Sequence, residues 1–181
     1  MKTTLNAIRA HNPCSDGWRK LLAHLGKIEA DDAPLSLLTI LDSNGIDDAL
    51  WALRAVEGYD REKRLYAVWC ARQVEHLLTD ERSRDALDVA ERFARGRATR
   101  EELAAARSAA VNAADAAAAA AAYAAYAAAD AAAVAAAYAA AYGAADAARA
   151  ASGTSSAQAA EFRRVCECLE AGVQPYPEDN V

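Results

Sequence analysis

An alanine-rich run at residues 113–151 settles the class of the fold, and it reads AADAAAAAAAYAAYAAADAAAVAAAYAAAYGAADAARAA. Alanine fills 29 of these 39 positions. Because alanine is the strongest helix former and is depleted in β-strands, the run predicts helix. The larger apolar residues lie mostly within the first hundred positions, where they can build an ordinary core. The sequence therefore predicts an all-α fold, a multi-helix bundle.

The length of the alanine-rich segment predicts that it is broken. One helix over residues 100–151 would be about 78 Å long, whereas a compact domain of this size has a radius of gyration near ~16 Å. We expect the segment to pack back on the bundle, with Gly143 as the first candidate break and Asp115 and Asp130 as weaker ones. A projecting helix that pairs with a partner stays open as the alternative. The predicted division is a helical core over 1–98, the Ala-rich helical segment over 99–151, and a C-terminal helix with an extended tail over 152–181, together forming one domain.

Start and stop signals place the other helices. Gly26 and Gly96 are expected to end helices, and Thr99 with Glu102 forms a capping box that opens the alanine-rich segment. The stretch at 65–71 is apolar on all sides, which is typical of a buried helix. The predicted helices cover residues 14–25, 34–42 (beginning at Pro34), 46–56, 61–78, 81–95 and 156–171.

Aromatic residues punctuate the alanines and are the first candidates for a binding surface. From Tyr126 to Asp146 the interruptions recur every four residues, apart from Gly143, so they wind around a helix as one ridge. The tyrosines either fill the space that alanine leaves or form an aromatic platform for a ligand or partner. Arginines are the candidates for holding phosphates. The candidate binding residues are Tyr123, Tyr126, Asp130, Tyr138, Tyr142, Arg64, Arg72 and Arg149.

Charge and cysteine content limit the class of protein. The net charge of −6 disfavours a strongly basic nucleic-acid binder. Residues 1–12 do not resemble a signal peptide, Asp130 interrupts the only apolar run long enough to suggest a membrane span, and Cys14 and Cys70 are expected to act as small hydrophobes. We therefore expect a reduced, cytoplasmic protein. A metal site made by His11, Cys14, Cys166 and Cys168 is disfavoured, because neither cysteine pair has the usual zinc spacing.

The sequence contains no recognisable catalytic motif. It has no Walker, GxGxxG, GxSxG or HExxH pattern, and its three histidines are His11, His24 and His76. The acidic residues Asp85, Asp88 and Glu91 are interpreted, together with Arg84 and Arg92, as a solvated salt-bridged face. We expect a non-enzymatic protein without a metal or cofactor.

Three stretches carry a family resemblance. They are RLYAVWCARQVEHLLTDERSRDALDVAERFARG at 64–96, ATREELAAARSAAVNAADAAAAAAA at 98–122, and the region 12–55. The chain resembles the Ala-rich, all-helical immunity protein family of bacteria and phages, in its phage-borne branch. That resemblance implies a role in bacterial or phage conflict and supplies no catalytic residues. The family usually punctuates its alanine run with Trp, Arg and Asp, whereas this chain uses Tyr.

Three functions follow from these observations. The leading hypothesis is a binding protein that neutralises a protein toxin or defence effector by occlusion, with an acidic surface that steers it towards a basic partner. The second is a phage anti-defence protein that sequesters a nucleotide immune signal. The third is a structural module whose alanine-rich helices form a homo-oligomer.

Overall fold

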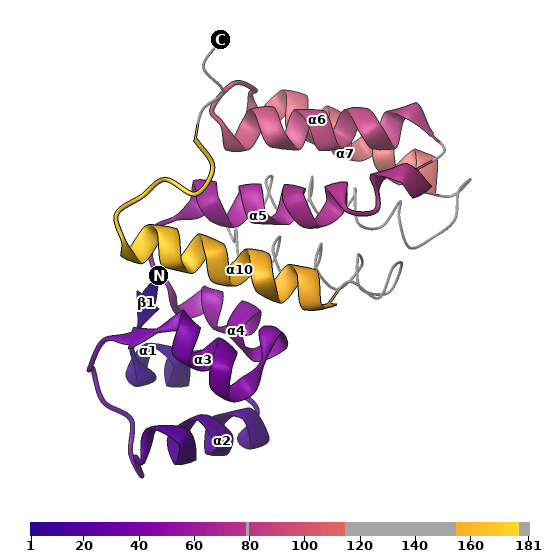
Figure 1. The fold of residues 1–181 in the computed structure, drawn as a ribbon. Coiled ribbons are helices and arrows are strands. Elements are labelled where there is room, and N and C mark those ends of the chain that lie inside the picture. The colour runs from indigo at the N-terminus through magenta and orange to yellow at the C-terminus, as the bar shows by residue number, and fades with distance from the viewer. Residues whose placement is uncertain (79, 115–154, 178–181) are drawn as a thin grey trace. The chain divides into compact units, whose positions relative to one another are not determined.

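The computed structural model describes residues 1–78, 80–114 and 155–177 (Figure 1). Within these residues the chain forms eight α-helices, two short 3-10 helices and one small sheet, so the predicted all-α fold is confirmed. The expected break and packing of the alanine-rich segment fall on residues outside the described part. The three-part division of the chain accordingly stays a prediction.

The described chain falls into two compact units. Unit 1 comprises Met1–Tyr59 and Ala159–Pro175, and unit 2 comprises Asp60–Gln158 and Tyr176–Val181. The elements that begin in unit 1 are β1 (Lys2–Thr3), α1 (Leu5–Ala10), α2 (Ser15–Leu25), β2 (Leu35–Ser36), α3 (Leu37–Asn44), α4 (Ile46–Ala52) and the 3-10 helix Leu53–Ala55. Those that begin in unit 2 are α5 (Asp60–Arg72), the 3-10 helix Glu75–Leu77, α6 (Glu81–Ala94), α7 (Arg100–Ala114) and α10 (Ser155–Glu170).

A two-stranded antiparallel sheet joins distant parts of unit 1. Lys2 lies opposite Ser36 and Thr3 opposite Leu35. The prediction of a helix beginning at Pro34 is therefore wrong by three residues. Leu35 and Ser36 are held in the sheet, and the Ser36 hydroxyl then accepts a hydrogen bond from the backbone N–H of Leu38, which makes Ser36 the N-cap of α3.

The N-terminus of α2 also departs from expectation. Cys14 is exposed and is the N-cap of this helix; its Sγ accepts a hydrogen bond from the backbone N–H of Gly17 at 3.4 Å. The prediction that Cys14 acts as a buried hydrophobe is therefore wrong, although Cys70 is buried as expected. At the other end, Gly26 closes α2 in the left-handed conformation, as predicted.

Unit 2 is built on α5, α6 and α7. The predicted burial of the apolar centre of α5 is confirmed, since Leu65, Tyr66, Ala67 and Val68 are nearly inaccessible to solvent. Helix α5 ends at Arg72 rather than 78, and a 3-10 turn follows. One core cluster joins the three helices and consists of Val68, Ala86, Ala90, Leu103 and Ala110.

The start of α7 has the predicted capping box. The backbone N–H of Glu102 donates to the Thr99 hydroxyl at 3.1 Å, and the Glu102 carboxylate accepts from the backbone N–H of Thr99 at 2.7 Å. These reciprocal bonds satisfy two backbone donors at the start of α7. Across residues 1–78, 80–114 and 155–177, no helix is long and apolar enough to span a membrane.

Candidate functional site

The structure describes two of the eight predicted binding residues. Arg64 and Arg72 lie on α5 in unit 2. The remaining six fall outside the described residues, and their proposed roles stay predictions: Tyr123, Tyr126, Asp130, Tyr138, Tyr142 and Arg149.

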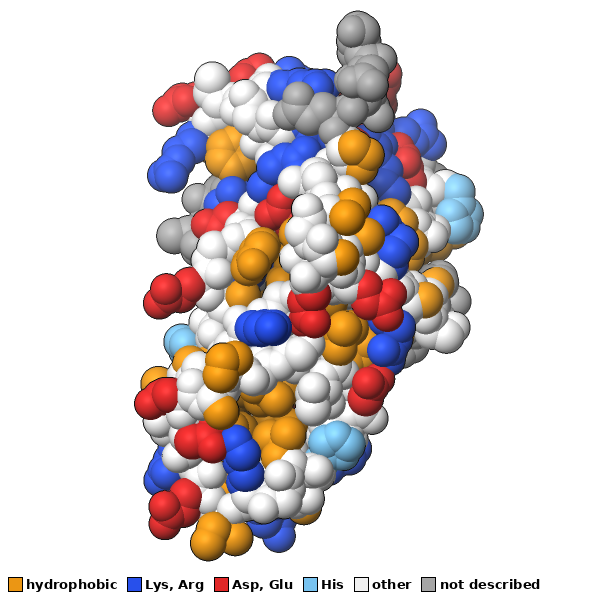
Figure 2. Space-filling model, turned by 60° about the vertical axis from the view of Figure 1, so that its left-hand side comes forward, with side chains coloured by type: hydrophobic (Ala, Val, Ile, Leu, Met, Phe, Trp, Pro, Cys, Tyr) orange, Lys and Arg blue, Asp and Glu red, His pale blue; other side chains and the backbone are white. Residues whose placement is uncertain are grey.

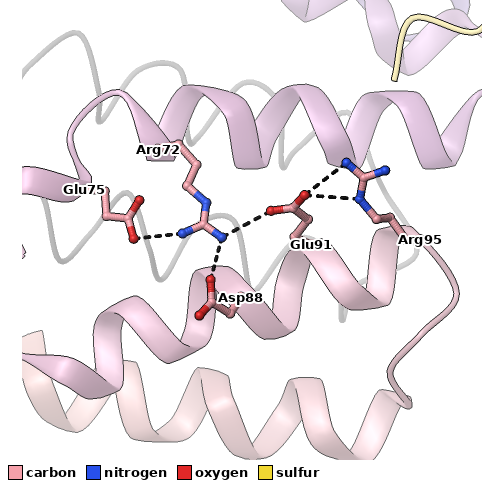
Figure 3. Close-up of polar contacts among 5 residues, drawn as sticks. All are labelled: Arg72, Glu75, Asp88, Glu91 and Arg95. Atoms are coloured by element: carbon pink, nitrogen blue, oxygen red, sulfur yellow. Dashed lines mark hydrogen bonds and ion pairs between the residues drawn. The ribbon is translucent and has the colours of Figure 1, made fainter. Parts of the chain in front are cut away.

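Arg72 lies at the centre of a network of charged residues from α5, from the 3-10 helix after it, and from α6 with its C-cap Arg95 (Figure 3). Its Nη1 donates to Glu75 at 2.8 Å, and its Nη2 donates to Asp88 at 2.5 Å and to Glu91 at 3.2 Å. The second oxygen of Glu91 accepts two hydrogen bonds from Arg95, both at 3.1 Å. The network therefore ties the end of α5 to the middle of α6.

The electrostatics of Arg72 follow from these contacts. Burial by itself would lower the pKa of Arg72, but hydrogen bonds to Asp88, Glu75 and Glu91 outweigh burial and raise this pKa above its ordinary value. The guanidinium is thus a permanent cation with both of its terminal nitrogens already engaged. A phosphate at Arg72 would have to compete with three carboxylates, so Arg72 is the weaker of the two described arginines as an anion ligand.

The salt-bridged face predicted from the sequence has different partners in the structure. Asp88 and Glu91 pair with Arg72 of α5, and Arg92 pairs with Glu102 of α7 at 3.6 Å. Arg84 instead donates to the backbone carbonyl of Leu78. Asp88, Glu91 and Arg92 are thus ion-paired as predicted, but most of their partners come from neighbouring elements, and Glu91 also pairs within its own segment, with Arg95.

Arg64 has a different environment from Arg72. Its guanidinium lies over the ring of Phe93, 5.5 Å from the ring centroid. The side chain is half-buried, and its Nε is buried with no acceptor among the residues that the structure describes. The aromatic face fixes the position of the cation without using its hydrogen-bond donors.

Next to Arg64, Lys63 is a buried cation that sequence reasoning missed. It is only 5% exposed, and its Nζ lies 3.9 Å from the Asp60 carboxylate. Burial lowers the pKa of Lys63; Asp60 opposes this shift, and the charge of Arg64 adds to it. The sequence places Lys63 only at the flank of the apolar centre of α5, so nothing in the pattern marks it as buried.

Unit 1 has a cleft of about 520 Å³ that was not predicted. Trp18 and Leu22 line it from α2, Arg9 lines it from α1, and residues 28–30 line it from the loop after α2. Ile28 in this loop is 94% exposed, more than any other large apolar side chain that the structure describes. Figure 2 shows hydrophobic side chains reaching the surface over the N-terminal elements, in the lower half of the view, with charged side chains around them.

Local contacts hold the loop that carries Ile28. Lys27 donates to the Asp31 carboxylate at 2.5 Å, and the carboxylate also accepts from the backbone N–H of Ala33 at 3.2 Å. The hydrogen bond from Lys27 lowers the pKa of Asp31. The backbone N–H of Asn6 in α1 donates to the Asp31 carbonyl at 3.1 Å. Ile28 is therefore presented on a loop that is bonded both to itself and to α1.

The sequence contained a weak signal for this cleft. Ile28 is an isolated apolar residue in the polar segment GKIEADD, whereas Trp18 shares a helical spacing with Leu21 and Leu25, which is typical of a core face. Trp18 is in fact only half-buried. An unpaired apolar residue in a short polar loop is the feature that could have identified this cleft.

The residues considered for catalysis or metal binding are dispersed. His11 follows α1, His24 lies in the last turn of α2, and His76 lies in the 3-10 helix after α5; all three are exposed. Within the part of the chain that the structure describes, no group of three His, Cys, Asp or Glu side chains is arranged to hold a metal ion.

Comparison with models of protein families, with curated proteins and with solved structures returns no match to this chain.

Proposed function

We propose that this chain is a binding protein of bacterial or phage conflict, which neutralises a protein toxin or defence effector by covering its working surface. Two independent lines support the proposal. One is the resemblance of residues 12–55, 64–96 and 98–122 to Ala-rich immunity proteins. The other is the cleft of unit 1, which combines an exposed apolar side chain with a tryptophan.

The cleft is the observation that carries the proposal. Trp is enriched among the residues that dominate protein–protein binding, and such anchors lie in pockets rimmed by polar residues. Ile28 stands exposed beside Trp18 and Leu22, with Arg9 and Glu29 at the rim. Covering a side chain such as Ile28 contributes about 1.5–3 kcal/mol, which is enough to make it an anchor.

The net charge of the chain and the acidic residues beside the cleft indicate the class of partner. The chain carries a net charge of −6, and the loop beside the cleft contains Glu29, Asp31 and Asp32 against a single lysine. An acidic surface accelerates encounter with a basic protein and disfavours an acidic one. The proposed partner is therefore a basic protein that presents an apolar side chain to the cleft.

Binding measurements on variants of the cleft test the proposal. The product of the neighbouring toxin or effector gene is purified and immobilised, and binding of the chain is followed by biolayer interferometry. Ile28→Asp and Trp18→Ala are expected to weaken binding about tenfold or more. The matched control is Val173→Asp, since Val173 is an apolar residue of unit 1 that is 56% exposed and does not line the cleft.

Two results would contradict the proposal. One is no binding at micromolar concentrations, which argues against occlusion of that partner. The other is equal weakening by Ile28→Asp and Val173→Asp, which removes the cleft as the contact. Thermal melts of each variant separate loss of contact from loss of fold.

The homo-oligomer remains a separate proposal. Its basis is the alanine-rich run at 113–151, because small side chains let helices approach closely. Analytical ultracentrifugation measures it directly, and a monomer at high micromolar concentration would exclude it.

A further inference from the structure

Unit 2 contains Arg61, Arg64 and Arg72 on α5 and Arg95 directly after α6, and Arg64 differs from the other three. Arg61 donates to the carbonyl of Tyr176 at 2.9 Å, Arg72 donates to three carboxylates, and Arg95 donates to Glu91. Arg64 has an aromatic partner, and its buried Nε has no acceptor within the described chain. A buried donor without an acceptor costs about 1–3 kcal/mol, so an acceptor supplied by a ligand would stabilise this site.

We propose that Arg64, held against Phe93, is the anion-binding residue of unit 2 and takes a phosphate group of a small ligand. The inference is independent of the partner-binding proposal, because it uses other residues in the other unit. The contacts of the two side chains distinguish Arg64 from Arg72 as anion ligands, whereas the sequence alone identifies both as candidates. Arg72 has three carboxylates on its donors, whereas Arg64 has none among the described residues.

The chemistry of Arg64 favours an oxyanion. A guanidinium presents its donors as a planar fork that matches two oxygens of one phosphate or carboxylate. The contact with Phe93 restrains the position of the guanidinium before binding, which reduces the entropy lost when a ligand is bound.

The neighbouring charge favours phosphate over carboxylate. Lys63 precedes Arg64 on α5 and is buried; its charge acts on Arg64, and the Asp60 carboxylate 3.9 Å from its Nζ offsets it in part. A phosphate monoester carries nearly two negative charges at neutral pH, whereas a carboxylate carries one. The doubly charged group therefore compensates more of the positive charge in this part of α5.

Thermal shift at low ionic strength tests the proposal with defined probes. Inorganic phosphate and a nucleoside monophosphate are titrated against the full chain, with acetate as the carboxylate arm and chloride as the control for ionic strength. We expect the two phosphate probes to raise the melting temperature with a saturable dependence, and acetate to raise it less. Arg64→Gln should weaken the apparent affinity about tenfold or more, since hydrogen bonds to charged groups contribute about 1.5–3 kcal/mol.

Two variants give the test its specificity. Arg64→Lys keeps the charge but loses the planar fork, and it should bind nearly as weakly as Arg64→Gln. Arg100→Gln makes the same change of charge at an exposed arginine of α7 and should bind like the wild type. Equal phosphate shifts in the wild type and Arg64→Gln, or shifts no larger than those with chloride or acetate, would overturn the proposal.

A measurement on the unmodified protein keeps the proposal testable if Arg64→Gln does not fold. Phenylglyoxal modifies accessible guanidinium groups, and mass spectrometry locates the modified residue. The phosphate probes should slow modification of Arg64 and leave Arg100 unaffected. Modification of Arg64 at the same rate with and without phosphate would rule out the site.

Discussion

Gly17 is a residue of α2 where the fold leaves no space for a side chain. A Cβ at this position would lie 2.5 Å from Oδ2 of Asp48 and 3.1 Å from Sγ of Cys14. Asp48 cannot easily move, because Asn44 donates to its Oδ2 at 2.7 Å and to the Gly17 carbonyl at 2.8 Å. The close approach of α2 to Asp48 therefore depends on glycine.

We expect Gly17→Ala to lower the free energy of unfolding by about 1–3 kcal/mol through overpacking. At an open helical position the same change would stabilise by up to about 1 kcal/mol. Urea unfolding followed by tryptophan fluorescence measures the difference. In an Asp48→Ala background most of the penalty should disappear, with Sγ of Cys14 as the remaining close neighbour; a penalty of the same size there would show that Asp48 is not responsible.

The Cys166 thiol gives unit 1 a defined dependence on alkaline pH. Burial raises the pKa of Cys166 from an ordinary value of 9.0 to about 12. Above pH 9 the unfolded chain therefore releases a proton that the folded chain keeps. The corresponding stability is fully present below pH 9 and is lost between about pH 9 and 12, with a slope of at most about 1.4 kcal/mol per pH unit.

Comparison with Cys166→Ala isolates this dependence. The variant should have a lower free energy of unfolding at neutral pH and a flatter decline above pH 9 than the wild type. Lys63, whose pKa is lowered, acts in the opposite direction and is common to both proteins. If the free energies of unfolding of the wild type and Cys166→Ala, measured with urea, decline in parallel from pH 8 to 11, the thiol does not contribute to the pH dependence.

At the scale of the element, the cap of α2 is suboptimal. The Cys14 sulfur accepts the hydrogen bond from Gly17, and thiol sulfur is a weak acceptor. We expect Cys14→Ser to raise the free energy of unfolding by several tenths of a kcal/mol, since Ser is among the best N-cap residues. Cys14→Ala is the control and should destabilise; if Ser and Ala give equal values in urea unfolding, the cap bond is not significant.

The charged network gives a second prediction for elements. Arg72→Met leaves Glu75, Asp88 and Glu91 close together without their cation. The groups are partly exposed, so we expect a loss of about 1 kcal/mol. Hydrogen exchange should quicken at the end of α5 and in α6, and not in α2–α4. Arg19→Met, which removes a fully solvated pair, should leave exchange in unit 2 unchanged.

The helix ends that depend on residues close together in the sequence were predicted best. The Thr99 capping box and the glycine that ends α2 need only a few residues of one segment, and both are present. The start of α3 was wrong because Leu35 and Ser36 pair with Lys2 and Thr3, more than thirty residues away. Local propensity contains no information about that pairing, so the error has a physical origin.

For the candidate sites, too, the sequence predicted some of the residues but not the contacts between elements. Arg64 and Arg72 were both identified from the sequence, but their different roles depend on Phe93 and on the carboxylates of α6. The cleft was missed because its lining comes from two helices and a loop. Residue types indicate which chemistry is available, whereas contacts between elements decide where it is used.

At the scale of the whole molecule, net charge governs the proposed encounter with a partner. With a net charge of −6, the association rate with a basic protein should fall as salt rises, because the screening length is only about 10 Å at 0.1 M. Ile28→Asp should act mainly on the dissociation rate, since it alters contact after docking. Stopped-flow or interferometry measures the association and dissociation rates at low and moderate salt. An association rate that does not change with salt would contradict electrostatic steering.

The division into two units bears on the order in which they are made. Unit 1 uses Ala159–Pro175 as well as Met1–Tyr59, and the residues of α5, α6 and α7 lie between these two parts in the sequence. During synthesis from the N-terminus, the ribosome therefore releases those three helices while unit 1 still lacks Phe162, Val165 and Cys166 of its core. A nascent chain halted before residue 159 therefore cannot complete unit 1.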